Sequence, residues 1–316
     1  MKRRDFIAKS AQAGAALSTL GIYACNTNTK GKTGIINQMD AKKLFFRISL
    51  AQWSFHRAIR KGSLNHLDFA AKSRSLECEG LEYVNAFFFD KAQDIPYLNE
   101  MLTRSKGEGQ ENVLIMIDGE GNLADADSVA RMKSIENHHK WVDAAHHLGC
   151  HSIRVNLGGG TNREDAVKAA IDSMTRLSDY SKEAGINILV ENHGGYSSDG
   201  KWMTNVFSQL KNENCGTLPD FGNFCIQRGN GGCVDEYDRY IGMKELLPFA
   251  KAVSAKSYNF DAQGNETQID FLKVMKMVKD VGYSGFVGIE FEGGGVSEEE
   301  GVILTRDLLR KVGKQL

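Results

Sequence analysis

The chain has little of what marks several common protein classes. It contains 3 prolines against 33 glycines, which is typical of short turns between regular elements and leaves little rigid linker. Its 39 lysines and arginines are balanced by 40 aspartates and glutamates, so there is no basic excess for nucleic-acid binding. The six cysteines include no Cys-x-x-Cys pair and no zinc-ribbon spacing, and we expect most of them to be core or strand residues, with Cys25 as the exception. What remains is an ordinary globular composition, 41% hydrophobic and 25% charged.

The first 25 residues have the three-part pattern of an export signal. Basic residues are followed by a mild apolar stretch rich in Ala, Gly and Leu, which is too short and small-sided for a stable transmembrane span. RRDFI (residues 3–7) resembles a twin-arginine signal, and IYAC (residues 22–25) resembles a lipobox in which the tyrosine is unusual. We therefore expect an exported, periplasmic protein with Cys25 as the candidate lipidated residue that anchors it to the membrane. A first amphipathic helix of the fold is the alternative.

The rest of the chain divides into a tether and one repeating domain. Residues 26–43 are rich in Asn, Thr, Lys and Gly and lack a core pattern, which predicts a flexible tether. Over residues 44–316, eight apolar strand-like runs alternate with longer helical patterns; the runs start at 47, 80, 112, 151, 186, 215, 252 and 285. Eight βα units of about 34 residues predict a single-domain (β/α)8 TIM barrel. A doubly wound open sheet fits less well, because no Gly-x-Gly-x-x-Gly follows the first strand.

Four helical patterns predict part of the outer ring. Ser128–Leu148 places its apolar side chains near one stripe, and residues 162–185 begin with a cap and an acidic first turn and stop at a glycine. Residues 269–281 and 298–312 repeat the pattern. Four histidines lie on the first of these helices, and we interpret them as solvated or helix-packing residues rather than metal ligands: His138, His139, His146 and His147.

Three carboxylates lie at similar heights at the ends of predicted strands. Glu191, Asp220 and Glu290 end the fifth, sixth and eighth strands, and in a barrel these ends form the site. Three carboxylates in a partly dry cavity repel one another, and a divalent cation removes that cost. Oxygen ligands suit Mg or Mn. An imidazole from His193, which shares a strand face with Glu191, makes Mn, Co or Zn suitable as well.

The alternative is three independent strand-end acids that Arg154 and Lys256 neutralise. Strand alternation sends these two cations inward, together with Asp118, Asn156 and the second acid of the last strand, Glu292. We treat Asp118, Arg154 and Asn156 as candidate substrate-binding residues. Trp53 either stacks on a face of the substrate or caps the barrel as a structural residue.

The segments at the ends of strands five to eight resemble one family. ENHGG, PDFGN, AKSY and GIEFEGG look like the xylose isomerase-like barrel superfamily, which includes sugar isomerases, ketose 3-epimerases, inosose dehydratases and AP endonucleases. The resemblance implies one divalent ion held by Glu, Asp, His and Glu, and Glu191, Asp220 and Glu290 match three of these ligands. Ser254 stands where the family has the histidine of His-x-Lys, and Asn223 stands where epimerases often carry a substrate-binding histidine. Both departures argue against an ordinary ketose 3-epimerase.

The resemblance implies a metal-dependent sugar isomerase or epimerase that abstracts an α-proton through an enediolate. By resemblance, Glu191 and Glu290 would move the proton, while Lys256 would stabilise an oxyanion or protonate a leaving hydroxyl. His193 remains a candidate ligand, acid or orienting residue. One alternative is a lyase or dehydratase acting on 3-keto sugars or glycosides, and another is a non-catalytic sugar-binding lipoprotein that lost its chemistry with Ser254. Export favours free sugars, oxidised sugars or glycosides as substrates over sugar phosphates.

Overall fold

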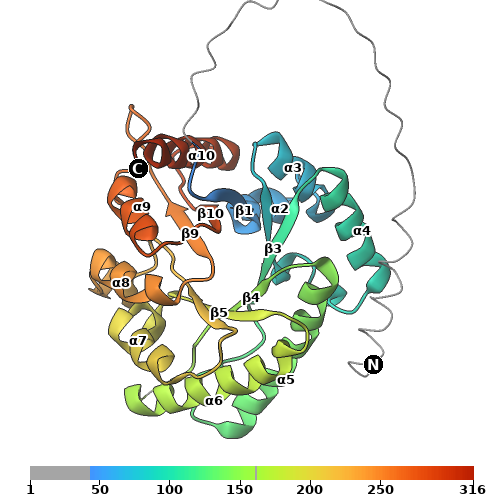
Figure 1. Ribbon diagram of the computed structural model, residues 1–316, viewed down its shortest axis with the longest axis vertical. Helices are drawn as coiled ribbons and strands as arrows, with labels where there is room; N and C mark the ends of the chain where they lie inside the picture. Colours follow the sequence, from blue (N-terminus) through green and yellow to red (C-terminus); the bar gives the residue numbers. More distant parts are fainter. Residues whose placement is uncertain (1–42, 161) are drawn as a thin grey trace, which may run out of the picture.

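Eight parallel strands form the centre of the structure and helices surround them (Figure 1). The computed structural model describes residues 43–160 and 162–316. The strands are β1 (Arg47–Ala51), β2 (Gly80–Val84), β3 (Glu111–Met116), β4 (Ser152–Val155), β5 (Asn187–Glu191), β6 (Cys215–Leu218), β9 (Val253–Ser257) and β10 (Phe286–Phe291). Their apolar runs are buried on both faces, as parallel strands require. The predicted TIM barrel is confirmed, and every strand begins within one residue of its predicted start.

The sheet runs in the order β6-β5-β4-β3-β2-β1-β10-β9, which leaves β6 and β9 as its two ends. Those ends meet through isolated parallel bridges, Thr217 with Ala250 and Asp220 with Ser254. At the second bridge Ser254 N donates to Pro219 O at 3.0 Å and Phe221 N donates to Ser254 O at 3.1 Å. The closure of the barrel therefore brings Asp220 directly beside Ser254.

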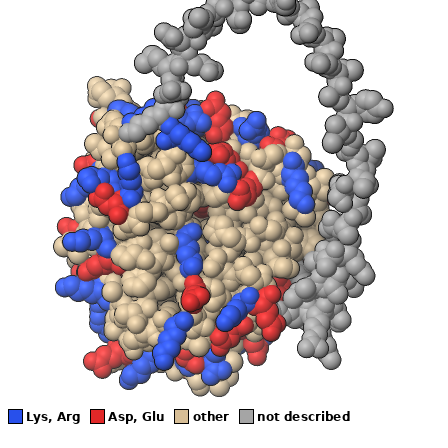
Figure 2. All heavy atoms as spheres, viewed as in Figure 1, with Lys and Arg blue, Asp and Glu red and all other residues tan. Residues whose placement is uncertain are grey.

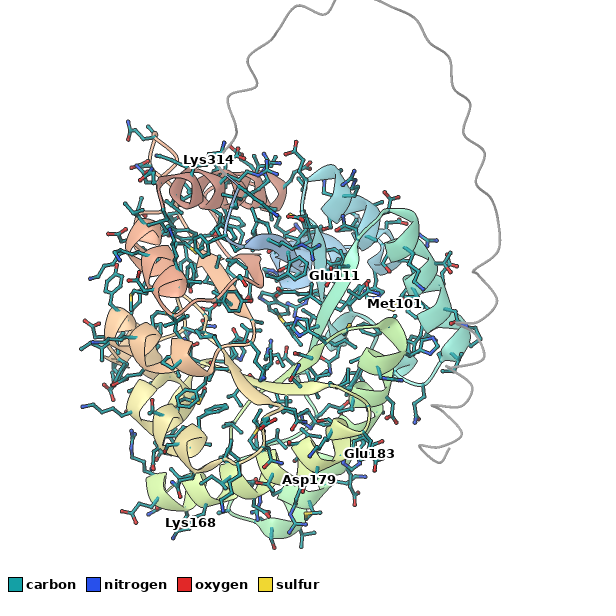
Figure 3. The ribbon with its side chains drawn as sticks, viewed as in Figure 1. Met101, Glu111, Lys168, Asp179, Glu183 and Lys314 are labelled. Atoms are coloured by element: carbon teal, nitrogen blue, oxygen red, sulfur yellow. A yellow bond between two sulfur atoms is a disulfide. The ribbon has the colours of Figure 1, made fainter. Side chains whose placement is uncertain are left out.

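Nine α-helices lie outside the strands in the described part of the chain. They are α2 (His56–Arg60), α3 (Phe69–Ser75), α4 (Ile95–Gly107), α5 (Ser128–Leu148), α6 (Arg163–Lys182), α7 (Gly200–Gln209), α8 (Arg239–Leu246), α9 (Phe271–Asp280) and α10 (Glu298–Gln315). Asp127 caps α5 and Asn162 caps α6, each accepting two backbone N–H bonds. In Figure 3 the labelled Lys168, Asp179 and Glu183 lie along and just beyond α6, where they are exposed.

Two apolar clusters hold these layers together. The larger lies between strands and helices and includes Ile153 and Val155, whose alternation turns the intervening Arg154 inward as predicted. The smaller fills the barrel interior and includes Leu114, Leu189 and Phe286. The interior is therefore a packed floor, and polar side chains collect above it at the carboxyl ends of the strands.

The histidines of α5 pack between helices, as predicted. His138 Nδ1 lies 2.7 Å from Ser134 O within the helix, and His146 Nδ1 lies 2.8 Å from Ala184 O. No helix of the described residues is long and apolar enough to cross a membrane. The expected export signal, the tether up to Lys42 and the candidate lipidation site Cys25 lie outside the described residues.

A disulfide-linked hairpin was not expected from the sequence. β7 (Cys225–Gly229) pairs antiparallel with β8 (Gly232–Glu236), and Cys225 is bonded to Cys233. The hairpin follows β6 and is largely exposed, whereas Cys78 and Cys150 are buried in the core. Figure 2 shows charged side chains of both signs spread over one face, with uncharged surface between them.

Candidate active site

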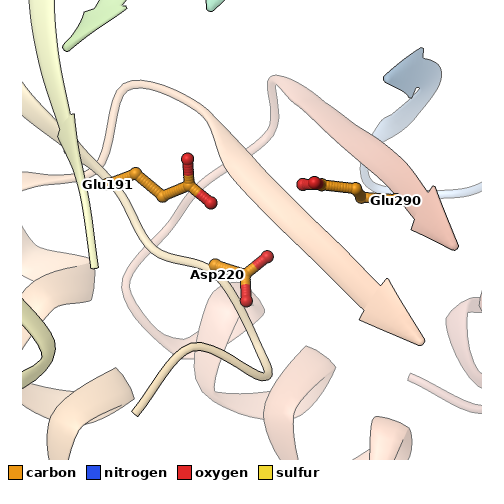
Figure 4. Close-up of side chains that lie close together, drawn as sticks. All are labelled: Glu191, Asp220 and Glu290. Carbon is orange, nitrogen blue, oxygen red and sulfur yellow. The ribbon is translucent and has the colours of Figure 1, made fainter. Parts of the chain in front are cut away.

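The structure brings Glu191, Asp220 and Glu290 together at the carboxyl ends of the strands. Glu191 ends β5, Asp220 lies two residues beyond β6, and Glu290 lies near the end of β10. All three are buried, and each offers an oxygen atom within 4.8 Å of the others. Figure 4 shows the three carboxylates pointing toward one another.

Two buried cations pair with two of the three acids, Glu191 and Glu290. Arg154 Nε lies 2.8 Å from Glu191 Oε2, and its Nη1 donates to Asp118 Oδ1 at 2.7 Å. Lys256 Nζ lies 3.0 Å from Glu290 Oε1 and 3.2 Å from Glu292 Oε2. The neutralisation by Arg154 and Lys256 that the sequence offered as an alternative therefore exists for these two glutamates.

Asp220 has no ion-pair partner among the described residues. Its Oδ1 accepts backbone N–H bonds from Gly222 at 2.8 Å and Asn223 at 2.9 Å, and its Oδ2 accepts from Ser254 Oγ at 2.6 Å. The Ser254 hydroxyl also lies 3.1 Å from Glu290 Oε2. The residue at the histidine position of the family motif thus joins two carboxylates through its hydroxyl.

The pKa values of these acids differ because their partners differ. Burial raises the pKa of Glu191 to about 7 and that of Asp220 to about 7, since the surrounding charges do not fully offset lost solvation. Burial acts on Glu290 too, but the Lys256 ammonium holds the pKa of Glu290 below its ordinary value. Asp118 is half-buried, which raises its pKa, but the Arg154 guanidinium outweighs this and holds the pKa of Asp118 at about 2.

Negative charge exceeds positive charge at this site. Five carboxylates share two cations, since Asp118 and Glu191 pair with Arg154, Glu290 and Glu292 pair with Lys256, and Asp220 pairs with neither. Such an excess in a buried site is relieved either by protons, as the raised pKa values of Glu191 and Asp220 indicate, or by a bound cation. The three converging carboxylates therefore fit an oxygen-ligated divalent ion.

His193 lies apart from the acidic cluster. Its side chain is exposed, its Nδ1 lies 3.0 Å from Asn156 Oδ1, and it is not among the residues whose ligand atoms converge. Asn156 in turn donates from Nδ2 to Asp118 Oδ1 at 2.8 Å. His193 thus belongs to a polar group at the rim together with two of the candidate substrate-binding residues.

The other candidates also have defined places. Asn223 Nδ2 donates to Glu191 Oε1 at 3.1 Å, so the residue at the epimerase histidine position contacts the cluster directly. Trp53 donates from its indole nitrogen to Glu292, stacks on His56 with ring centroids 4.8 Å apart, and lies under the Arg60 guanidinium. It is part of a packed wall of the site.

One further buried acid, Glu82 on β2, was not predicted from the sequence. It is 1% exposed and accepts from Ser49 Oγ at 2.6 Å, while its second oxygen, also buried, has no hydrogen-bond partner. Burial raises the pKa of Glu82 to about 8. The sequence does contain a sign of this acid, a glutamate inside the apolar run GLEYV. Such a residue is unusual in a buried strand, because burying an acid without a cation is costly.

Comparison with known proteins places the chain in one family of barrels. Residues 70–312 match the family described as xylose isomerase-like TIM barrel. The chain belongs to this family. No curated protein matches the sequence. Among solved structures, a xylose isomerase-like TIM barrel protein from Mycobacterium smegmatis in complex with magnesium is 16% identical, with a TM-score of 0.61 over 85% of this chain and 97% of that chain.

Two further structures are similar to this xylose isomerase-like barrel. The 3-keto-D-glucoside 4-epimerase from E. coli is 12% identical, with a TM-score of 0.66 over 84% of this chain and 99% of that chain. A sugar phosphate isomerase/epimerase from Parabacteroides distasonis is 15% identical, with a TM-score of 0.64 over 88% of this chain and 98% of that chain. At these identities the likeness shows the fold, and the chemistry has to be argued from the site.

Proposed function

We propose that this protein is a divalent-metal-dependent sugar isomerase or epimerase that works by α-proton abstraction through an enediolate. The observation that supports this most is the convergence of Glu191, Asp220 and Glu290, buried and within 4.8 Å of one another, at the catalytic end of the barrel. The names of the similar structures, which include sugar epimerases and isomerases, agree with the proposal.

The three carboxylates would hold the cation. Mg²⁺ or Mn²⁺ suits this donor set better than Zn²⁺ or Co²⁺, because the converging side chains offer only oxygen atoms and the imidazole of His193 lies with Asn156 instead. When bound, such an ion supplies positive charge that stabilises negative charge developing on neighbouring substrate oxygens.

The two glutamates suit opposite roles in proton transfer. Lys256 keeps the pKa of Glu290 low, so this carboxylate is ionised and can accept the α-proton. Glu191 lies in the same cluster and would return the proton; its pKa of about 7 belongs to the metal-free site, and a bound cation would lower it.

The substrate is best matched by an uncharged sugar or glycoside. Arg154 and Lys256, the buried cations next to the acidic cluster, are both paired with two carboxylates, so neither is available to a phosphate group. The amide of Asn156 and the exposed edge of His193 would contact sugar hydroxyls at the rim. Elimination from a 3-keto sugar or glycoside is a second candidate reaction, because the Lys256 ammonium lies beside Glu290, where it can protonate a leaving group.

Export to the periplasm remains part of this proposal. The disulfide between Cys225 and Cys233 supports it, since exposed disulfides persist mainly in oxidising compartments. A lipid anchor on Cys25 would keep the barrel at a membrane surface.

Metal analysis is the first test. We expect purified protein dialysed against Mn²⁺ or Mg²⁺ to hold about one equivalent, because one triad of carboxylates converges. Glu290→Gln should lose most of this metal, whereas Glu111→Gln, which removes an exposed acid paired with Arg47, should retain it. Metal retained in Glu290→Gln, or absent from the wild type, would argue against the proposed centre.

Exchange in deuterated water tests the reaction. Wild-type protein incubated with free ketoses, aldoses and 3-keto glucosides should incorporate deuterium at the α-carbon, and Glu290→Gln should reduce the rate by about 10²–10⁴-fold. An isomerase or epimerase yields a product of unchanged composition, whereas a lyase also releases water or an aglycone. A protein that binds sugar without exchanging hydrogen would instead be a non-catalytic binding lipoprotein.

A further inference from the structure

Lys256 lies between a carboxylate of the acidic cluster and a carboxylate of the rim. Its side chain is 1% exposed, and its ammonium group lies 3.0 Å from Glu290 Oε1 and 3.2 Å from Glu292 Oε2. The side chain of Glu290 is 6% exposed and that of Glu292 is 31% exposed. One ammonium is therefore shared between an acid that would bind metal and an acid that reaches toward solvent.

Glu292 is itself held in place by Trp53. The indole nitrogen donates to Glu292 Oε1, which leaves Oε2 to face Lys256. The indole is fixed by stacking on His56, and Phe87 packs beside it with ring centroids 6.1 Å apart. A chain of contacts thus runs from the packed wall through Trp53 and Glu292 to the ammonium group.

We propose that Glu292 is a positioning residue that shares the Lys256 ammonium with Glu290 and so balances part of its charge outside the acidic cluster, which leaves Glu290 and Asp220 available to a divalent cation. This inference rests on the proposed metal centre. Glu292 does not contact the ion in this arrangement and acts through Lys256.

The physical reason is that a buried ammonium must keep a carboxylate partner. With Glu292 present, part of the positive charge of Lys256 is balanced outside the acidic cluster. Without Glu292, the acids that remain to balance Lys256 are Glu290 and then Asp220. Ser254, which stands in place of a histidine, supplies no nitrogen ligand that would favour the metal. Lysine and cation would then compete for the same oxygen atoms.

Calorimetric titration of metal-free protein with Mn²⁺ tests this. Glu292→Gln should weaken Mn²⁺ binding by about tenfold, the range in which residues around a metal site act. Trp53→Phe, which keeps a ring but removes the N–H donor, should weaken it by about threefold. Glu299→Gln is the control. Glu299 on α10 forms an ion pair with Lys72 on α3, 2.8 Å apart, so this variant also removes a carboxylate from a lysine and should leave Mn²⁺ binding unchanged.

A double-variant cycle separates positioning from simple loss of negative charge. In a Lys256→Met background, Glu292→Gln should change Mn²⁺ affinity by less than about twofold, because the group through which it acts is gone. An undiminished tenfold effect there would overturn the inference, as would equal affinity of Glu292→Gln and wild type. A wild type that binds no Mn²⁺ would remove the proposed metal centre as well, so the two failures are distinguishable. Melting of each metal-free variant checks that it is folded.

Discussion

At the scale of single residues, the charged partner decides what each buried acid does. Asp118 faces Arg154, and Glu290 faces Lys256. Each cation keeps the pKa of its carboxylate low, although burial acts to raise it. Glu82 has only the Ser49 hydroxyl, and burial raises its pKa to about 8. Glu82 is therefore protonated near neutral pH and lies beside β10, where a side chain at Gly288 would come within 2.4 Å of it.

Glu82→Gln should be nearly neutral below about pH 4.5 and should stabilise the protein increasingly as pH rises, with the full gain above about pH 8. Because the folded pKa of about 8 exceeds the unfolded value of about 4.5, the contribution of Glu82 to stability is complete below the unfolded pKa and is lost as pH rises through 8. Glutamine keeps an acceptor for Ser49 and cannot ionise. We expect a gain of roughly 3–6 °C in melting temperature at about pH 9, measured by thermal unfolding.

Glu111→Gln is the matched control, since this exposed acid is 53% accessible and already ion-paired with Arg47. Its melting temperature should follow that of the wild type across the same pH range. An identical pH profile for Glu82→Gln and wild type would mean that Glu82 is ionised in the fold already.

At the scale of elements, alternation along strands predicted the inward residues wherever a strand continued. Arg154 and Glu290 lie within β4 and β10 and point inward as expected. Alternation predicted that His193 shares the face of Glu191, but β5 ends at Glu191, and the chain turns with Gly194 at a φ of 92°. The side chain of His193 therefore lies by Asn156. Alternation fails here because the backbone turns after the last paired residue and is no longer extended.

The β7–β8 hairpin could not be read from the sequence for a related reason. Its strands are short and exposed, so no apolar alternation marks them, and the pairing of Cys225 with Cys233 depends on a register that bulges shift. The hairpin follows Asn223, whose side chain contacts Glu191 and whose carbonyl accepts from Ser198 Oγ at 2.7 Å. The hairpin thus continues directly from a segment of the site.

Reduction of the disulfide should open this hairpin, because an isolated two-stranded hairpin is only marginally stable in water. Arg228 in β7 is exposed, and trypsin should cleave after it at least about tenfold faster in the Cys225→Ser/Cys233→Ser variant, since a disulfide closing a short loop contributes about 2–3 kcal/mol. Mass spectrometry of the fragments measures this rate.

Cys215→Ser provides the comparison, since Cys215 is a free cysteine at the start of β6 outside the hairpin. Cleavage at Arg228 should be as slow in that variant as in the wild type. Equal rates in all three proteins would show that neighbouring contacts, rather than the disulfide, hold the hairpin closed.

At the scale of the whole molecule, barrel closure creates the site. Glu191, Asp220 and Glu290 come from strands separated by up to 99 positions (191 to 290), and they meet because β9 and β6 join the two ends of the sheet. The strand rhythm was enough to predict this convergence. The pairing of each cation and the burial of Glu82 depend on side-chain packing across the barrel, which periodicity does not specify.

Closure also means that the proposed metal ion would compete with protons for the buried acids. Burial raises the pKa values of Glu191 and Asp220 to about 7, so at about pH 6 a cation must displace their protons and at about pH 8 it need not. In metal-free protein these two acids stabilise the fold below their unfolded pKa values near 4, and that stabilisation is lost as pH rises through 7. Stabilisation by added metal should therefore grow with pH.

We expect Mn²⁺ at about 100 times its dissociation constant to raise the melting temperature by about 5–10 °C at pH 8, since such saturation contributes about 2.7 kcal/mol. The same concentration should give about a third of that rise at pH 6. Thermal unfolding with chelator and with Mn²⁺ at both pH values measures the difference. Glu290→Gln, which removes a ligand oxygen, should show neither the rise nor its pH dependence. An equal rise at both pH values would place the bound ion away from Glu191 and Asp220, because only those acids exchange protons for metal in this range.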